Sequence, residues 1–346
     1  MTEEDYKKLN CYLNTAFPLL ECEDQFLINN VLNIDVSISD LQYYLKDLEI
    51  DSDIKENNLT FQDVFLIARD IIASINPLYL KEYDNLIDSG QLDFSYNYDY
   101  PDSECVYFSN SKMRIININR EFNYYDVVML IHEFFHYTNM QTENNINEYL
   151  LTEFISIYFE IYAQKYLIDK GVPINEISLY RRLQSTFNHS QQFQKYSPVL
   201  FAFGSFGNIS GESMNFINKH FYPMSSDEFN KSCKYVLDKF KQIENKYRMD
   251  IKYEKNFDNT EFAYKLSEPF KYNYRYILGA MLAFYAIEYC DINDILYLND
   301  NINKDEFMNM DPIALFKKIK IDINDDCFIT NVAYAIRKFA DKNKQR

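Results

Sequence analysis

Glycine and proline are scarce in this chain. Only 6 of its 346 residues are Gly and 8 are Pro, where average usage is roughly 7% and 5%. A many-stranded β-sandwich or β-barrel needs turn-forming residues far more often than this, so both fold classes are excluded. The sequence therefore predicts a mainly helical fold.

Clustered cysteines and long apolar runs are missing too. The 6 cysteines are scattered and contain no C-x-x-C pair, so no disulfide framework is expected. The longest apolar run, Tyr276 to Ile287, is too short to cross a bilayer, and the acidic N-terminus is no signal peptide. These absences predict a soluble, cytoplasmic protein with no membrane partner.

Basic residues are in deficit. The chain has 35 Lys and Arg against 52 Asp and Glu, a formal net charge of -17. Nucleic acids and anionic membrane surfaces attract basic patches, so neither is expected as a partner. With 47% hydrophobic residues the chain can bury a large core, which excludes overall disorder. A cationic substrate or a bound metal is compatible with this charge, but composition selects neither.

The first third of the chain combines helices with a short β-rich segment. Apolar residues recur at helical spacing from Thr60 to Ser74 and again from Leu78 to Ile87. Residues 89–104 are polar and rich in Tyr, which indicates a surface loop or irregular strands. Alternating apolar and polar residues at 106–109 and 112–119 predict two short strands.

Helices dominate the rest of the sequence. Asn123 is a suitable cap for a helix that begins at Tyr124, and a long helix over Asn147 to Lys170 is stopped by Gly171. Further helices are predicted at 226–246, 271–290, 311–319 and 328–343. Composition marks no clear domain boundary, and both one compact unit with two lobes and two separate domains stay open.

One short motif carries specific chemistry. It reads His132-Glu-Phe-Phe-His136, and residues four apart lie on one face of a helix, so the two histidines can bind one metal ion. Glu133 then lies beside the metal, where it can act on a water molecule. This is the zinc-peptidase signature. The alternative is a chance pair of core histidines on a buried helix.

A catalytic zinc needs a third protein ligand and one open position. No His follows His136 until His189, so an acidic ligand is expected; the candidates are Glu143, Glu148, Glu153 and Glu160. Glu153 is favoured because it lies deep in an apolar helix, where an unpaired carboxylate would be costly. Glu160, seven residues on, shares its face and could contact a ligand histidine from behind, or it could be a solvated charge.

Several segments resemble the oligoendopeptidase F and thimet oligopeptidase family of zinc metallopeptidases. Thr152-Glu-Phe-Ile-Ser-Ile-Tyr-Phe-Glu160 is similar to the family's A-E-V-A-S-T-x-N-E segment, and Asp126-Val-Val-Met-Leu-Ile-His-Glu133 to its D-V-x-T-L-x-H-E. Weaker similarities occur at Gly90–Phe94, Cys105–Ser109 and Ile115–Asn119. Tyr272-Asn-Tyr-Arg-Tyr-Ile-Leu-Gly279 resembles the late Y-x-Y-x-Y-x-x-G run.

The resemblance implies a mainly α, zincin-type (gluzincin) metallopeptidase with a small β element beside the zinc-binding helix. Residues 1–95 would form a reduced N-terminal helical lobe, and residues 96–346 the catalytic region. One Zn²⁺ would be bound by His132, His136 and Glu153, and Glu133 would be the general base for a zinc-activated water that hydrolyses a peptide or protein substrate. One or two of Tyr272, Tyr274 and Tyr276 are expected to stabilise the oxyanion, with Tyr274 or Tyr276 favoured over Tyr272. Strand 112–119 would pair with an extended substrate.

Two departures from the family pattern leave other functions open. Phe135 replaces the Gly that usually precedes the second zinc His, and residues 265–270 lack the family's His before the tyrosine run. His189, His220 or the tyrosines would have to take the role of that His. One alternative is a catalytically weakened zincin-fold protein that binds peptides or a partner. Another is a regulatory protease with one protein substrate.

Overall fold

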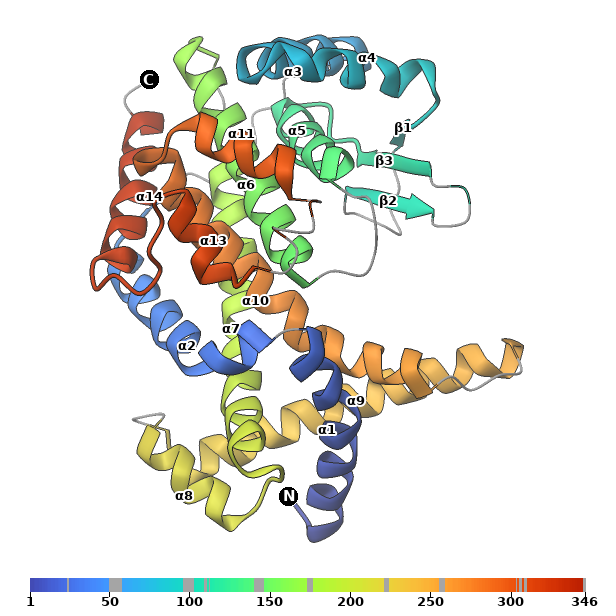
Figure 1. The fold of residues 1–346 in the computed structure, drawn as a ribbon, viewed down its shortest axis with the longest axis vertical. Helices are drawn as coiled ribbons and strands as arrows, with labels where there is room; N and C mark the ends of the chain where they lie inside the picture. Colours follow the sequence, from blue (N-terminus) through green and yellow to red (C-terminus); the bar gives the residue numbers. More distant parts are fainter. Residues whose placement is uncertain are drawn as a thin grey trace. The chain divides into compact units, whose positions relative to one another are not determined.

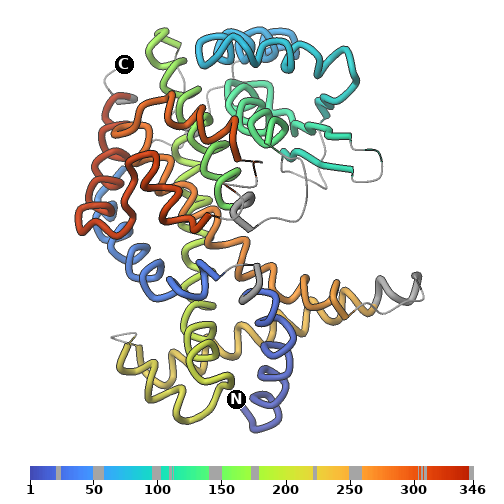
Figure 2. The backbone as a smooth tube through the Cα atoms, viewed as in Figure 1, coloured from blue at the N-terminus to red at the C-terminus, as the bar shows by residue number. Residues whose placement is uncertain are grey.

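The computed structural model is mainly helical, with one small β-sheet (Figure 1). Figure 2 traces the backbone in the same orientation, with the residues that are not described in grey. The structure describes residues 1–23, 25–49, 58–95, 103–108, 111, 113–139, 146–172, 177–220, 224–254, 259–302, 304, 307 and 310–344. The prediction of a mainly helical chain is confirmed.

The chain divides into two compact units, and neither is a single continuous segment. Unit 1 comprises Met1–Asp40 and Phe187–Ile277, and unit 2 comprises Leu41–Thr186 and Leu278–Arg346. The chain passes from one unit to the other within three continuous helices: α2 (Gln25–Leu45), α7 (Ile177–Phe206) and α10 (Asn259–Tyr289). The boundary expected after residue 95 falls inside unit 2.

Unit 2 contains the sheet and most of the shorter helices. Besides the ends of the three shared helices, its described elements are α3 (Phe61–Ile75), η1 (Pro77–Tyr79), α4 (Leu80–Asp88), β1 (Leu92–Ser95), β2 (Glu104–Phe108), β3 (Met113–Asn119), α5 (Tyr124–Asn139), α6 (Ile146–Asp169), α11 (Ile292–Asn301), α13 (Pro312–Lys318) and α14 (Phe328–Lys344). α5 and α6 pack along one another, and α5 also contacts α3 and β3.

The sheet has three strands in the order β1-β3-β2. β1 pairs with β3 in parallel, with Leu92 opposite Ile116, and β2 pairs with β3 in antiparallel fashion, with Cys105 also opposite Ile116. The two predicted strands are present, and β1 adds a third within the segment expected as a loop or irregular strands. The peptide-pairing role expected for strand 112–119 is wrong, because β3 is the central strand and has a partner on both sides.

Local signals set the ends of two helices in unit 2. At the start of α3, Asp63 N donates to Thr60 Oγ1 at 3.2 Å and Thr60 N donates to Asp63 Oδ2 at 2.8 Å, which is a complete capping box. After α6, Gly171 has a φ of +75° and its N–H donates to the carbonyl of Ile168. Glycine adopts this left-handed conformation without strain, so the predicted stop at Gly171 is confirmed.

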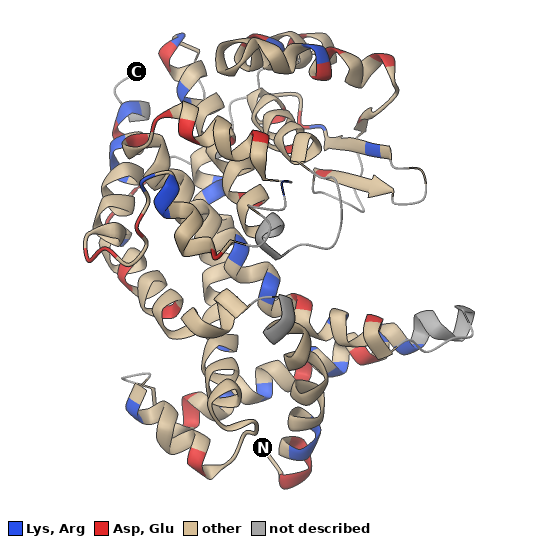
Figure 3. Ribbon diagram, in the orientation of Figure 1, with Lys and Arg blue, Asp and Glu red and all other residues tan. Residues whose placement is uncertain are grey.

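Unit 1 is built from long helices. In addition to its parts of α2, α7 and α10, it contains α1 (Glu3–Glu23), α8 (Gly211–His220) and α9 (Ser226–Glu254). α9 packs against α1 and α8 and, where its side chains are described, carries charges of both signs (Figure 3). α10 continues through Pro269, so a turned or extended segment around Tyr272 to Tyr276, which this proline would have permitted, is not formed.

Among the described residues, no helix combines the length and the apolar character needed to cross a membrane. The cysteines whose side chains are described are free thiols: Cys11, Cys105, Cys233, Cys290 and Cys327. The expectation that this chain has no disulfide framework holds for these five residues.

Candidate metal centre

The helix that carries the two motif histidines has a well-defined start. Asn123 Oδ1 accepts the N–H of Tyr125 at 2.8 Å, as an N-cap does. The Asp126 carboxylate turns back and accepts the N–H groups of Glu121 at 2.8 Å and Phe122 at 2.9 Å. These two bonds offset the left-handed backbone of Phe122, whose φ is +62°. α5 is therefore anchored directly after β3.

Three side chains of unit 2 converge between α5 and α6. His132 and His136 lie one helical turn apart, and their Nε2 atoms are 3.1 Å from one another. Glu153, on α6, brings its Oε1 atom within 3.6 Å of His136 Nε2. The potential ligand atoms of all three residues lie within 4.8 Å of one another. The structure therefore assembles the predicted ligand set from two helices.

These separations suit one small divalent ion. Four-coordinate zinc has Zn–N distances of about 2.0–2.1 Å, so its tetrahedral donors lie roughly 3.3 Å apart. The measured 3.1 and 3.6 Å bracket that value. His132 is buried at 4% exposure, whereas the side chains of His136 and Glu153 are 12% and 13% exposed. Two imidazoles and one carboxylate are donors that zinc accepts, and the group could bind a metal ion.

A buried carboxylate lies behind His132. Glu160 Oε2 is 3.1 Å from His132 Nδ1, although this contact does not have the geometry of a hydrogen bond. Arg182, on α7, donates its Nε–H to Glu160 Oε1 at 3.0 Å and its Nη2–H to Glu160 Oε2. Glu160 is therefore a paired interior charge and not a solvated one, and it contacts a histidine as the sequence suggested. Arg182 was not identified from the sequence.

The two histidines have different electrostatic surroundings. Burial and the neighbouring His132 hold the pKa of His136 well below its usual range. Burial also acts to lower the pKa of His132, but the carboxylates of Glu160 and Glu133 outweigh it and raise that pKa. For Glu160, burial opposes ionisation, yet the charge of Arg182 and the contacts with His132 and Arg182 lower its pKa to about 2. Glu160 is thus an anion at neutral pH.

Glu133 lies next to His132 on α5 and is buried, at 4% exposure. Burial raises the pKa of Glu133 to about 7, while the charge of His132 and a backbone hydrogen bond from Cys105 oppose the rise. Cys105 belongs to β2, so this edge strand reaches the same place as the metal ligands. A carboxylate that titrates near neutral pH is suited to accept and return a proton.

Phe135, the departure from the family pattern on α5, does not occupy the space between the ligands. Its ring is fully buried and stacks on Phe159 of α6, with centroids 3.7 Å apart and an interplanar angle of 14°. The Phe135 ring also makes an edge-to-face contact with the ring of Tyr79, with centroids 5.8 Å apart. The bulky residue is therefore accommodated by aromatic packing between two helices and η1.

The three tyrosines proposed for oxyanion stabilisation belong to unit 1 and lie on α10. Tyr272 and Tyr276 are one turn apart, with ring centroids separated by 4.6 Å, and both contact His189, which stacks on Tyr276 at 4.8 Å. Tyr274 is buried, at 1% exposure, and the centroid of its ring lies 6.5 Å from that of Phe26. Their role in oxyanion stabilisation stays a prediction.

The other candidate residues are less informative. His189 Nδ1 is 3.0 Å from Asn273 Oδ1, and His220 is an exposed residue at the end of α8 that packs on Phe216. Glu143 lies outside the described residues, and of Glu148 only the backbone, within α6, is described. Among the described His, Cys, Asp and Glu residues, the grouping that could hold a metal is the one around Glu153.

Comparison with known proteins identifies no family. No protein-family model matches the sequence, and no curated protein matches it. A solved structure from Chlamydophila abortus, named as a "putative peptidase", aligns over 93% of this chain with 17% sequence identity and a TM-score of 0.49. The alignment covers 55% of that protein, so this chain spans about half its length. A likeness this distant carries no functional weight, and the residues of the site must support any assignment.

Proposed function

We propose that this protein is a zinc-dependent peptidase of the zincin type, with the metal bound by His132, His136 and Glu153. The observation that carries the proposal is the convergence of these three side chains within 4.8 Å, with a buried Glu directly after the first histidine. A pair of unrelated core histidines would not need an acidic side chain from a second helix at the same point.

Glu133 is the residue to which the proposal assigns the proton transfers. When bound, zinc supplies a Lewis acid that polarises the peptide carbonyl and acidifies water. The Glu133 carboxylate takes the proton of the attacking water and then delivers it to the nitrogen of the leaving amine. In the metal-free chain, burial raises the pKa of Glu133 to about 7, which suits a group that accepts and returns a proton near neutral pH.

The substrate would be a peptide in extended conformation. Within the described sheet, β2 pairs only with β3, so the other edge of β2 has no strand beside it. The backbone hydrogen bond from Cys105 to Glu133 puts this strand next to the proposed base. A peptide added to that edge would be bound through its main chain, which gives affinity with little sequence selectivity. In this proposal β2, and not strand 112–119, pairs with the extended substrate.

The binding-protein alternative draws little support from the site. A metal site that only stabilises the fold has no use for a buried general base, yet Glu133 is present. The Phe135 substitution, which first suggested weakened catalysis, is absorbed by packing against Phe159. What still favours a slow enzyme is the missing His before the tyrosine run.

Digestion of a broad peptide mixture tests the proposal. The zinc-loaded protein should cleave peptides, a chelator should stop cleavage, and added zinc should restore it. Glu133→Gln keeps the side-chain volume but removes the base, so it should lower turnover by at least about 10²–10⁴-fold while zinc content stays unchanged. Equal cleavage by the wild type and the variant would refute the assigned base. If neither cleaves while both bind zinc, the binding-protein alternative and the protease with one protein substrate both gain support.

A further inference from the structure

Arg182 is the only charged group on α7, among the described side chains, that is buried against the metal-ligand helices. It is 9% exposed, and its partner Glu160 is 1% exposed. An unpaired carboxylate at such a depth would cost several kcal/mol, by general estimates of ion desolvation. The presence of Glu160 behind His132 therefore depends on the guanidinium beside it.

The contact between Arg182 and Glu160 is two-pronged. Nε faces Oε1 and Nη2 faces Oε2, so the plane of the carboxylate is determined by the plane of the guanidinium. Oε2 is also the atom that lies 3.1 Å from His132 Nδ1. A carboxylate paired with a guanidinium can only accept hydrogen bonds, so it favours a proton on Nδ1 and leaves the Nε2 lone pair for a metal.

We propose that Arg182 is a positioning residue for the metal centre: it orients Glu160, and Glu160 in turn sets the ring orientation and tautomer of His132. The inference rests on the proposed function only in taking the ligand to be zinc. A lysine at position 182 would keep the charge but could not bind both oxygens in one plane, so it should orient the carboxylate poorly.

The adjacent residue offers a matched control. Arg181 also pairs with a glutamate, Glu121, but this pair is partly exposed, at 26% and 31% of the two side chains. Glu121 lies in the turn before α5 and contacts neither histidine in any described interaction. Arg181→Lys therefore makes the same chemical change on the same helix, without reaching the ligands.

The experiment measures zinc affinity of the metal-free full chain by competition with a chromogenic chelator. Arg182→Lys should weaken zinc binding by about 10–100-fold, the usual effect of losing an outer contact to a ligand. Arg181→Lys should change it by less than about twofold, as expected for an exposed pair. Substitution with Co²⁺ should give an altered visible absorption spectrum for Arg182→Lys and an unaltered one for Arg181→Lys.

A double-variant comparison tests the route through Glu160. If Arg182 acts only by orienting that carboxylate, Glu160→Gln and the combined Glu160→Gln, Arg182→Lys protein should bind zinc equally well, because coupled effects do not add. Additive losses would overturn the inference. So would wild-type affinity and an unchanged Co²⁺ spectrum in Arg182→Lys.

A second variant keeps the inference testable if Arg182→Lys does not fold. If circular dichroism shows that Arg182→Lys is unfolded, the pair can be replaced together by Glu160→Met and Arg182→Met, since buried ion pairs often tolerate apolar substitution. Weakened zinc binding by this folded protein supports the inference, and wild-type binding overturns it. A wild-type protein that binds no zinc would overturn the proposed function and the inference together.

Discussion

Gly279 on α10 lies against the backbone of Glu153 on α6. A Cβ atom added to Gly279 would be 3.3 Å from the backbone N of Phe154 and 3.4 Å from the Cβ of Glu153. The contact with Phe154 N would be tighter than most Cβ contacts, and that atom is main chain, which cannot rotate away. The absence of a side chain at position 279 therefore lets the two helices approach one another at a proposed metal ligand.

Gly279→Ala should displace this part of α6. We expect the free energy of unfolding to fall by about 1–3 kcal/mol, the usual range for overpacking, and zinc affinity to fall with it because Glu153 moves. Gly211→Ala is the control, since its Cβ would meet no atom within 4 Å. Chemical denaturation and chelator competition measure the two quantities. Wild-type zinc affinity in Gly279→Ala would show that α6 tolerates the extra methyl group.

The ligand set makes a prediction that metal analysis can check directly. His136→Ala and Glu153→Ala should each lose most bound zinc, since each removes one of three protein ligands. Glu148→Ala, on the same helix, should keep the metal. Zinc retained by Glu153→Ala and lost by Glu148→Ala would move the third ligand to the start of α6.

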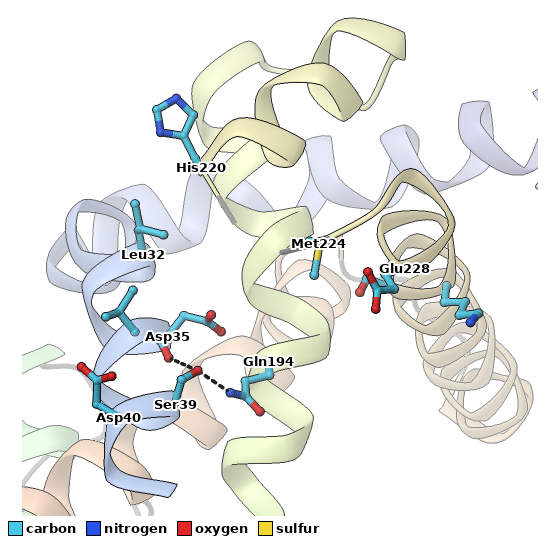
Figure 4. Close-up of a pocket in the computed structure, with 11 residues that line it drawn as sticks. Leu32, Asp35, Ser39, Asp40, Gln194, His220, Met224 and Glu228 are labelled. Carbon is cyan, nitrogen blue, oxygen red and sulfur yellow. Dashed lines mark hydrogen bonds between the residues drawn. The ribbon is translucent and has the colours of Figure 1, made fainter. Parts of the chain in front are cut away.

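Stability should depend on pH through Asp35 in unit 1. Its carboxyl group lines a cavity of about 570 Å³, together with Asp40, His220, Glu228 and Lys231 (Figure 4). Burial raises the pKa of Asp35 to about 6 from the ordinary 3.8, although the Ser197 hydroxyl donates to it at 2.6 Å and opposes the rise. The folded state thus favours the protonated form.

The sign follows from that raised pKa. The cost of ionising Asp35 is absent below about pH 4 and complete above about pH 6, so stability should fall as the pH rises through this window. Asp35→Asn should remove this slope and raise the free energy of unfolding at pH 7.5 by about 1–3 kcal/mol, at roughly 1.36 kcal/mol per pKa unit. Asp40→Asn, exposed on the same helix, is the control. Denaturant titrations at pH 4.5 and 7.5 would contradict the assignment if Asp35→Asn kept the wild-type slope.

The tyrosines of α10 separate into two groups that mutation can distinguish. Tyr274→Phe affects a buried ring, so we expect any effect to be on stability. Tyr276→Phe and Tyr272→Phe remove the hydroxyl groups of the two tyrosines whose rings contact His189. If either supplies the oxyanion donor, its variant should lose about 10²–10³-fold in turnover with KM and zinc content unchanged. Unchanged turnover in all three would remove the tyrosines from the mechanism.

Features encoded over a few residues could be predicted from the sequence. The capping box of Thr60 and Asp63, the stop at Gly171 and the paired histidines of α5 each depend on contacts within one or two helical turns. Glu153 could also be predicted as a ligand, because a carboxylate in the apolar middle of a helix is costly to bury unless it has a partner. In these places the local pattern and the fold agree.

Contacts between distant segments could not be predicted in the same way. Nothing in the residues around Arg182 marks it as the partner of Glu160, and adjacent Arg181 has the same local pattern but a different partner. The central position of β3 depends on which strands pair, which alternation alone does not specify. Pro269 permitted an extended or turned segment before Ile277, but α10 continues through it. The fully buried Leu266 and Phe270 on either side supply packing that offsets the backbone hydrogen bond that proline cannot make.

The discontinuous path of the chain has a consequence for synthesis. All three proposed zinc ligands and Glu133 are made early, on α5 and α6, but Gly279 and the remainder of unit 2 follow only after the whole of residues 187–277. A chain emerging from the ribosome therefore displays the ligands well before α10 can pack behind Glu153. Because such long-range closure is slow, the apolar faces of the nascent metal-binding helices stay uncovered until α10 has been synthesised and can pack on α6.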